Sequence, residues 1–408
     1  MKLSKHKLGE LIEVTRGASL SGQFYAEEGE LIRLTLGNFN MNGGGFKENT
    51  SKTDLYYTGT VKDEFILNKG DIITPLTEQS LGLLGTTARI PENGKYIQSQ
   101  DVALVKCKEG LLDPNFCYYL IFSSIVRQQL SAGAQQTKIR HTSPDKIKDC
   151  TVWVPEFEEQ KRIGRILTDI DEKITLNRQI NDNLEAMAKQ LYDYWFVQFD
   201  FPNEDGKPYK SSGGAMVWNE KLKREIPQGW IICQIKDFMR IFTGKKDVSK
   251  AVPGNYKFFS CAPEPITSNE YIYDGYAVLV SGNGSYTGRV GFYKGKFDLY
   301  QRTYACVLDE EVRNISFFYY TLRYLFQPIY SGGKHGSSIP YIVLGDLADF
   351  RFVFNEMVCK KFVDIVTPMF DEQLLRLQEI EELTKQRDAL LPLLMNGQAT
   401  VNYHLSAY

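Results

Sequence analysis

The chain carries one short segment twice: IKDCTVWV at positions 147–154 and LADFRFVF at positions 347–354, an offset of 200 residues. The second half of each copy is rich in β-branched and aromatic residues, which predicts a strand. Apolar residues then recur at helical spacing in both copies and match at the same offset: Ile163, Ile166, Ile170 and Ile174 in the first, and Val363, Val366, Phe370 and Leu374 in the second. A repeated strand and helix predicts two similar units.

Matches further upstream keep their order while the distances between them change. The segment FCYY at 116–119 matches FFYY at 317–320 at an offset of 201, and residues 8–17 resemble residues 235–244 at an offset of 227. Framework segments that persist between loops of different length indicate a duplicated unit whose copies have diverged in their loops.

Each unit is expected to have a β-rich front and a helical back. Runs of β-branched and aromatic residues predict strands near residues 71–74, 101–105, 277–280 and 303–307. Apolar residues three and four positions apart predict long helices over residues 156–195 and 356–394. Pro368 and Pro392 fall inside the second helix, so we expect a kink or fray at each.

Helices of this length cannot bury their apolar seams inside a small domain, so an antiparallel coiled coil is the economical arrangement. We therefore expect an α+β fold in which a pair of long antiparallel helices separates two β-rich domains, with a pseudo-two-fold internal repeat. Asn177 falls in the seam, where it is either buried and fixes the register or solvated at the seam edge. Residues 200–214, rich in Asp, Gly, Pro and Ser, predict an extended connector.

The composition excludes several classes of protein. A chain of 408 residues with 43% hydrophobic residues is long and apolar enough for two or three folded domains, which excludes a disordered protein. Its 48 Lys and Arg against 50 Asp and Glu give a net charge of −2, so the whole chain is no polycation. No apolar run is long enough to span a membrane and no signal peptide stands at the start, which favours the cytoplasm.

Motifs for catalysis, cofactors and metals are missing from the sequence. The seven cysteines and four histidines lack metal-ligand spacing, so we expect reduced, mostly buried thiols and no metal site. Neither a phosphate-binding loop nor the Asp/Asn-Pro-Pro-Tyr/Phe motif of a methyltransferase occurs. Pro144-Asp145 followed by Glu159-Gln160-Lys161 superficially matches a nuclease site, but this Glu opens a predicted helix, where acidic residues are favoured. We expect no catalytic residues and no cofactor on this chain.

Segments in the helices and the connector carry a resemblance to a known family. They are PEFEEQKRI at 155–163, QLYDYWFVQFDFP at 190–202, LKREIPQGW at 222–230 and RDALLPLLMNG at 387–397. These segments resemble the DNA-specificity subunit of Type I restriction–modification enzymes. The similarity extends over nearly the whole chain and is weak in the fronts, which in that family are the target recognition domains.

The resemblance implies a non-catalytic protein that binds double-stranded DNA at an asymmetric, bipartite target, with one half-site read by each recognition domain. It implies methyltransferase and restriction subunits as partners, and S-adenosylmethionine, ATP and Mg on those partners. The expected domains are recognition domain 1 (1–153), a central helix (154–200), a connector (201–229), recognition domain 2 (230–353), and a distal helix with its tail (354–408).

Polar loops in the two fronts supply candidate DNA contacts. Cations and amides suit phosphates, while Arg, Lys, Asn and Gln suit base edges. The candidates in the first front are Gln79, Ser80, Arg89, Gln135, Gln136, Lys138, Arg140 and His141. Those in the second are Asn283, Tyr286, Arg289, Lys334, His335, Ser337 and Ser338. Ordinary solvated loops, and a plain hairpin turn at residues 282–284, are the alternative explanations.

A protein-interaction scaffold is the alternative function. A coiled coil with two β-rich heads that bind protein or glycan fits the 13% aromatic content equally well. Salt dependence separates the two hypotheses, because DNA affinity falls steeply with salt as counterions are released from phosphates.

Overall fold

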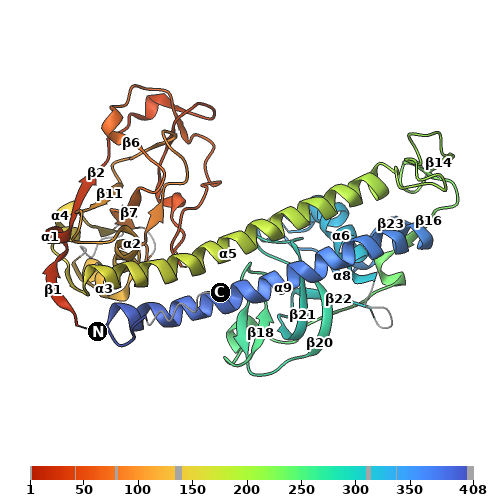
Figure 1. Ribbon diagram of the computed structural model, residues 1–408. Helices are drawn as coiled ribbons and strands as arrows, with labels where there is room; N and C mark the ends of the chain where they lie inside the picture. The colour runs from red at the N-terminus through yellow and green to blue at the C-terminus, as the bar shows by residue number, and fades with distance from the viewer. Residues whose placement is uncertain are drawn as a thin grey trace. The chain divides into compact units, whose positions relative to one another are not determined.

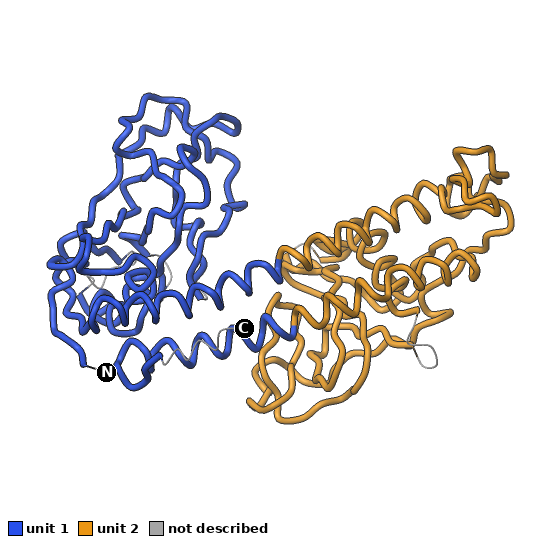
Figure 2. Tube along the Cα trace, in the orientation of Figure 1, with its two compact units in different colours: residues 1–178, 378–408 blue, residues 179–377 orange. Residues whose placement is uncertain are grey.

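The computed structural model describes residues 2–41, 43–78, 81–133, 140–308, 314–336 and 338–401. The chain divides into two compact units (Figure 2). Unit 1 comprises residues 1–178 and 378–408, and unit 2 comprises residues 179–377. The long helices α5 (Phe157–Tyr192) and α9 (Glu356–Met395), labelled in Figure 1, each contribute to both units (Figure 2).

Unit 1 contains two main sheets. The four-stranded sheet has the order β2-β11-β7-β9, and its strands are β2 (Ile12–Arg16), β11 (Val102–Cys107), β7 (Ile72–Pro75) and β9 (Ala88–Arg89). The five-stranded sheet has the order β3-β5-β4-β10-β6, and its strands are β3 (Tyr25–Ala26), β5 (Tyr56–Tyr57), β4 (Ile32–Arg33), β10 (Tyr96–Ile97) and β6 (Ile66–Leu67). Apolar residues of β7 and β11 alternate between two buried clusters, so this strand pair forms the centre of the unit.

One strand pair of unit 1 joins the start of the chain to the segment that precedes helix α5. Strand β1 (Ser4–Lys7) pairs antiparallel with β13 (Thr151–Val154), which leads directly into α5. The shorter helices are α1 (Leu8–Leu11), α2 (Pro114–Phe122), α3 (Ser124–Gly133) and α4 (Pro144–Lys148). Asp113 caps α2 by accepting the Phe116 backbone N–H at 2.9 Å, and Pro114 fits the first helical position.

Unit 2 is built around one sheet of six strands in the order β17-β22-β20-β21-β18-β19. Its strands are β17 (Arg240–Thr243), β22 (Thr303–Val307), β20 (Tyr273–Ser281), β21 (Val290–Leu299), β18 (Tyr256–Phe259) and β19 (Ile266–Ser268). Strand β16 (Ile231–Gln234) pairs antiparallel with β23 (Arg351–Phe354), which leads into α9. The remaining helices are α6 (Ile315–Thr321), α7 (Gln327–Tyr330) and α8 (Leu344–Ala348), with a π-helical turn at Leu322–Phe326.

The structure confirms the internal repeat. Helix α4 and strand β13 recur as α8 and β23 at an offset of 200, and β1 recurs as β16 at an offset of 227. Gly17 and Gly244 occupy equivalent positions where the chain passes a neighbouring backbone. A Cβ atom would lie 2.2 Å from the Gln98 carbonyl oxygen at the first and 1.5 Å from that of Leu299 at the second. Both copies therefore require glycine at this point.

The two long helices pair antiparallel in each unit. In unit 1, Asp171 accepts a hydrogen bond from Arg387 at 2.8 Å, while Asn177, further along α5, donates to Glu379, earlier in α9, at 2.9 Å. Asn177 is only 1% exposed, which favours the buried seam position over the solvated one. In unit 2 the rings of Tyr192 and Phe362 lie 5.8 Å apart, while Gln373, further along α9, donates to the carbonyl oxygen of Asn181, earlier in α5, at 3.2 Å.

Helix α9 is less interrupted than its prolines predict. The helix runs unbroken through Pro368 and continues past Pro392 to Met395. A proline inside a helix costs about 3 kcal/mol because one backbone hydrogen bond is lost. Burial of the seam on both sides of Pro368 offsets this cost, since Val366 and Phe370 are at most 4% exposed.

The expectation of an extended connector at residues 200–214 is wrong. The chain folds back so that Pro202 pairs with Pro208, and the rings of Phe201 and Tyr209 stack at 4.7 Å. A hairpin of β14 (Met216–Asn219) and β15 (Arg224–Pro227) follows. Phe201 also packs on Trp230 at 5.1 Å, so aromatic packing overrides the polar, turn-rich composition that suggested a linker.

All seven cysteines are free thiols and most are buried, as the sequence predicts. No helix in the described ranges is long and apolar enough to cross a membrane.

Candidate nucleic-acid interface

Two polar loops of unit 1 meet in a short antiparallel pair. Strand β8 (Thr77–Glu78) lies beside β12 (Arg140–His141), with Arg140 opposite Glu78 and His141 opposite Thr77. The pairing continues as the Thr142 N–H donates to the Leu76 carbonyl oxygen at 2.8 Å. The loop after β7 and the loop before α4 therefore form one surface.

A buried carboxylate organises this surface. Glu78 is 2% exposed, and its Oε2 accepts the backbone N–H groups of Gly82, Leu83 and Leu84 at 3.0–3.1 Å. Its Oε1 lies 3.2 Å from Nη1 of Arg140. Glu78 thus holds the turn after β8 and the cation of β12 at once.

Two arginines proposed as DNA contacts are engaged within unit 1. Arg140 also donates to the backbone oxygen and hydroxyl of Ser131. Arg89 donates to Oδ1 of Asn115 at 2.7 Å, and its guanidinium lies 5.0 Å from the centre of the Tyr118 ring. His141 is exposed. The candidates Gln79, Ser80, Gln135, Gln136 and Lys138 lie outside the described residues.

The two candidate loops of unit 2 also join. Asn283 and Tyr341 form an antiparallel bridge, and the Gly284 N–H donates to the Pro340 carbonyl oxygen at 3.0 Å. The Ile342 N–H donates to the Gly282 carbonyl oxygen at 2.9 Å. This bond matches the one from Thr142 to Leu76 in unit 1, so both units share one loop-pairing scheme.

The joined loops of unit 2 present aromatic and basic side chains. Tyr286 is 48% exposed, and Lys334, His335 and Ser338 are exposed as well. The His335 ring stacks on Tyr341 at 5.3 Å and its Nε2 lies 3.0 Å from Oδ2 of Asp346. Ser337 lies outside the described residues.

Arg289 is held by a hydrogen bond to Ala262 and lies beside the ring of Tyr286. Its Nη2 donates to the Ala262 carbonyl oxygen at 2.5 Å, and its guanidinium lies 5.6 Å from the centre of the Tyr286 ring. Partial burial lowers the pKa of Arg289, although an arginine stays charged at neutral pH. The side chain is therefore held in place beside the exposed Tyr286.

Sequence reasoning missed three residues of these surfaces. Glu78 stood in a candidate loop but was not singled out, because its buried role depends on Arg140 more than sixty residues away. Tyr341, 38% exposed, was not considered, nor was Arg302, an exposed residue whose carbonyl oxygen accepts the Gly282 N–H at 2.9 Å. The offset of 200 could have found Tyr341, since it is the repeat counterpart of His141. Across the described chain, no group of three or more His, Cys, Asp or Glu side chains could hold a metal ion.

Comparison with known proteins identifies the family. The model of the Type I restriction modification DNA specificity domain matches residues 2–186 and 227–383. The MjaIX specificity subunit of Methanocaldococcus jannaschii is 25% identical over 324 residues, which cover 72% of this chain and 71% of the relative. The EcoDI specificity subunit of Escherichia coli is 32% identical over 182 residues, which cover 43% and 40%.

A solved structure supports the fold. The crystal structure of the Type I restriction–modification S subunit from M. genitalium aligns with a TM-score of 0.63 and 17% identity, covering 97% of this chain and 96% of that one. Since the family model matches both copies of the repeat and most of the chain, the protein belongs to the family of Type I restriction–modification DNA-specificity subunits.

Proposed function

We propose that this chain is the sequence-specific DNA-binding subunit of a Type I restriction–modification enzyme and recognises an asymmetric, bipartite target. The observation that carries the proposal is the shared loop pairing with different side chains. Arg140 and His141 face Glu78 and Thr77 in unit 1, whereas Tyr341 faces Asn283 in unit 2. One scaffold that presents two different surfaces suits two different half-sites.

The exposed side chains support DNA contact. Lys334 carries a cation for a phosphate, and Tyr286, His335 and Ser338 offer stacking or hydrogen bonding at the same surface. Asn283 and Arg289 have the chemistry to read adenine and guanine edges. In unit 1 the candidates remain His141 and, from the sequence alone, Gln79, Ser80, Gln135, Gln136 and Lys138. Arg140 acts first by joining β12 to Glu78 and Ser131, and Arg89 by its contacts with Asn115 and Tyr118 of helix α2.

We assign the recognition domains to residues 1–153 and 230–353. The central helix (154–200) and the distal helix (354–408) would separate them, and residues 201–229 would join the central helix to the second domain. Neither domain contributes catalysis, so the reaction belongs to partner subunits that bind S-adenosylmethionine, ATP and Mg.

The helices are the proposed docking surface for methyltransferase subunits, and restriction subunits join through the assembly. Several apolar side chains of α5 and α9 in unit 2 face solvent: Met187 at 54%, Ile365 at 44%, Leu375 at 60% and Leu377 at 54% exposure. Met187 and Ile365 line an open cavity of about 800 Å³. Contiguous exposed apolar surface is typical of protein-interaction sites, and the shared cavity of Met187 and Ile365 supports such a site here.

Co-expression with the neighbouring methyltransferase in a methylation-free host tests the proposal. Mapping N6-methyladenine across the host DNA should reveal one asymmetric motif with two specified halves, and the motif should vanish when this chain is omitted. Methylation that is independent of the chain would contradict the proposed function.

A further inference from the structure

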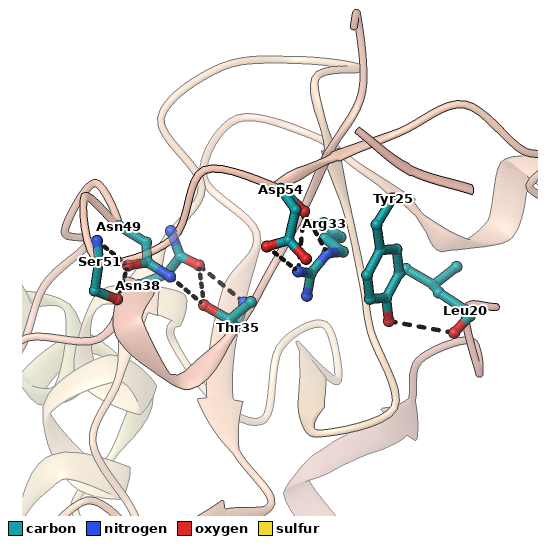
Figure 3. A network of polar contacts seen from close by, with 8 residues as sticks. All are labelled: Leu20, Tyr25, Arg33, Thr35, Asn38, Asn49, Ser51 and Asp54. Carbon is teal, nitrogen blue, oxygen red and sulfur yellow. Dashed lines mark hydrogen bonds and ion pairs between the residues drawn. The ribbon is translucent and has the colours of Figure 1, made fainter. Parts of the chain in front are cut away.

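Unit 1 contains a polar pocket of about 320 Å³ whose lining includes no residue of the paired strands β8 and β12. Figure 3 shows the polar network at its wall, contributed by β3, β4 and the segment that follows β4. This volume lies at the lower end of the range of small-molecule sites, so the pocket fits one small ring system. Its lining includes Leu20, Tyr25, Arg33, Thr35, Asn49 and Lys52.

Arg33 is the central polar group of the pocket. It is 6% exposed, and its guanidinium lies 3.8 Å from the centre of the Tyr25 ring. Its Nε and Nη2 donate to the Asp54 carbonyl oxygen at 3.1 and 3.0 Å, and Nη2 also reaches the Asp54 carboxylate at 3.1 Å (Figure 3). Nη1 makes no hydrogen bond within the described part of the chain. A buried arginine is thus fixed in orientation with two N–H donors left over.

A second donor lies in the same pocket. Asn49 donates from Nδ2 to Thr35 Oγ1 at 2.8 Å, and its Oδ1 accepts from the Ser51 backbone N–H and hydroxyl at 2.9 and 2.6 Å (Figure 3). These bonds fix the amide and leave one Nδ2 hydrogen. The pocket therefore offers preset donors from both Arg33 and Asn49.

The charges around the pocket balance. Asp54 neutralises Arg33, and the rim carries one cation, Lys52, and one carboxylate, Asp101. Balanced charge does not favour a phosphate, whereas a neutral ring with acceptor atoms on its edge matches the free donors. Apolar walls from Leu20, Leu34 and Leu36 suit the faces of such a ring.

The pocket adjoins the proposed DNA surface. Its rim residue Asp101 accepts the Leu76 N–H at 2.8 Å, and Leu76 directly precedes strand β8. Leu76 in turn accepts the Thr142 N–H next to β12. Two backbone hydrogen bonds thus connect the pocket rim to both paired loops of unit 1.

We propose that this pocket receives one nucleobase of the bound DNA, turned out of the stack, and that Arg33 Nη1 donates to the acceptor edge of guanine. The inference rests on the proposed DNA-binding function and adds a specificity-determining residue to it. Arginine donors match O6 and N7 of guanine, and a protein that takes a base out of the stack reads it in a fitted pocket.

The test uses the full chain assembled with its methyltransferase partner and its mapped target. Pyrrolocytosine, a fluorescent cytosine analogue that brightens when its partner base leaves the stack, is placed opposite each guanine of the half-site read by unit 1. The wild-type complex should brighten the probe at one position and should bind adenine there about tenfold more weakly than guanine.

Two variants address the pocket in different ways. Arg33→Met removes the donors, and Ala18→Leu fills the pocket while leaving the Arg33–Asp54 pair intact, so one of them remains informative if the other fails to fold. Both should lose the fluorescence change and the discrimination at that position. Lys69→Met, an exposed lysine of the same unit, is the matched control and should keep both.

Other outcomes overturn the inference. A half-site without guanine, or an unchanged response in a folded Ala18→Leu complex, would refute it. Arg33-dependent binding of free guanosine monophosphate, with no probe response in DNA, would overturn the DNA origin of the base. Failure of the proposed function is a different result, because the wild-type complex would then show no bipartite motif at all.

Discussion

The hydroxyl of Tyr119 donates a hydrogen bond to Oδ2 of Asp171 at 2.7 Å and so fastens helix α2 to helix α5 in unit 1. The other oxygen of the same carboxylate accepts from Arg387 at 2.8 Å. Burial and the nearby charge of Asp171 both raise the pKa of Tyr119, so the hydroxyl stays protonated at neutral pH and can donate. One carboxylate thus connects a recognition domain to both long helices.

Replacing Tyr119 with phenylalanine should weaken this attachment. The change removes a hydrogen bond to a charged group, and we expect a loss of about 1–3 kcal/mol in the free energy of unfolding. Thermal and denaturant unfolding of the full chain measure it. Tyr271→Phe is the control, since Tyr271 is 44% exposed, and equal stability of the two variants would contradict the role of the hydroxyl.

Replacing Arg387 with methionine should cost more. Arg387 is 8% exposed and bonds to Asp171, to Asp388 and to the Gly43 carbonyl oxygen, so its loss leaves Asp171 without its cation. We expect a destabilisation of about 2–4 kcal/mol, below the upper range for buried ion pairs because Asp171 is partly exposed. Lys385→Met, at an exposed pair on the same helix, should change stability by less than about 0.5 kcal/mol.

Replacing Glu78 with glutamine should disturb one half-site only. The amide keeps an oxygen for the three backbone N–H groups but loses the charge that holds Arg140. We expect DNA affinity to fall for the half-site read by unit 1, while base preferences at the other half remain unchanged. Competition binding with DNA altered in either half measures this, with Glu109→Gln at an exposed loop position as control. Equal losses at both halves would contradict the assignment.

Replacing Lys334 with alanine should change the salt dependence of binding. If Lys334 contacts a phosphate, affinity should fall for all sequences alike, and the slope of log affinity against log salt should flatten by about one. An unaltered slope in the Lys334 variant would exclude a phosphate contact there.

Replacing Arg289 with methionine should instead relax the preference at one base pair, at a cost of about 1–3 kcal/mol.

The turn that replaces the expected connector should be sensitive to acid. Asp200 accepts the Ser211 hydroxyl at 2.6 Å and its backbone N–H at 2.7 Å, and these bonds lower the pKa of the carboxyl below its ordinary value. A lowered folded-state pKa adds stability above the unfolded value of about 3.9, and the gain is lost as the pH falls through the folded value.

The measurement compares Asp200→Asn with the wild type between pH 7 and pH 3. We expect the wild type to be more stable at pH 7 and the difference to shrink below about pH 4. Asp205→Asn, at an exposed position of the same turn, should show no such trend. A difference that is constant over the whole range would contradict the account.

Much of the framework could be predicted from the sequence. The offset of 200 residues located α4 with α8 and β13 with β23, because local patterns of apolar residues survive in both copies. The helix limits were also close: residues 156–195 were expected, and α5 with its π-helical turn extends to Val197. Sequence patterns therefore predict the helices and strands whose formation depends on residues close to one another along the chain.

Contacts between distant residues could not be predicted. Tyr119 donates to Asp171 in unit 1, whereas the buried hydroxyl of its repeat counterpart Tyr320 has no hydrogen-bond partner among the described residues, so the repeat does not conserve this contact. Likewise Arg140 belongs to a polar loop, and only the fold shows that Glu78 lies opposite it. The polar loops that precede α4 and α8 are repeat counterparts at the offset of 200, but the pairing of each with a second loop arises from the sheet and not from local sequence.

Exchange of one recognition domain tests whether each domain reads one half-site. Residues 230–353 are replaced by the corresponding segment of a relative with a known, different target, and N6-methyladenine is mapped after co-expression with the methyltransferase. We expect a hybrid motif that keeps one original half and gains the donor's half. A motif changed in both halves, or in neither, would contradict the reading of one half-site by each recognition domain.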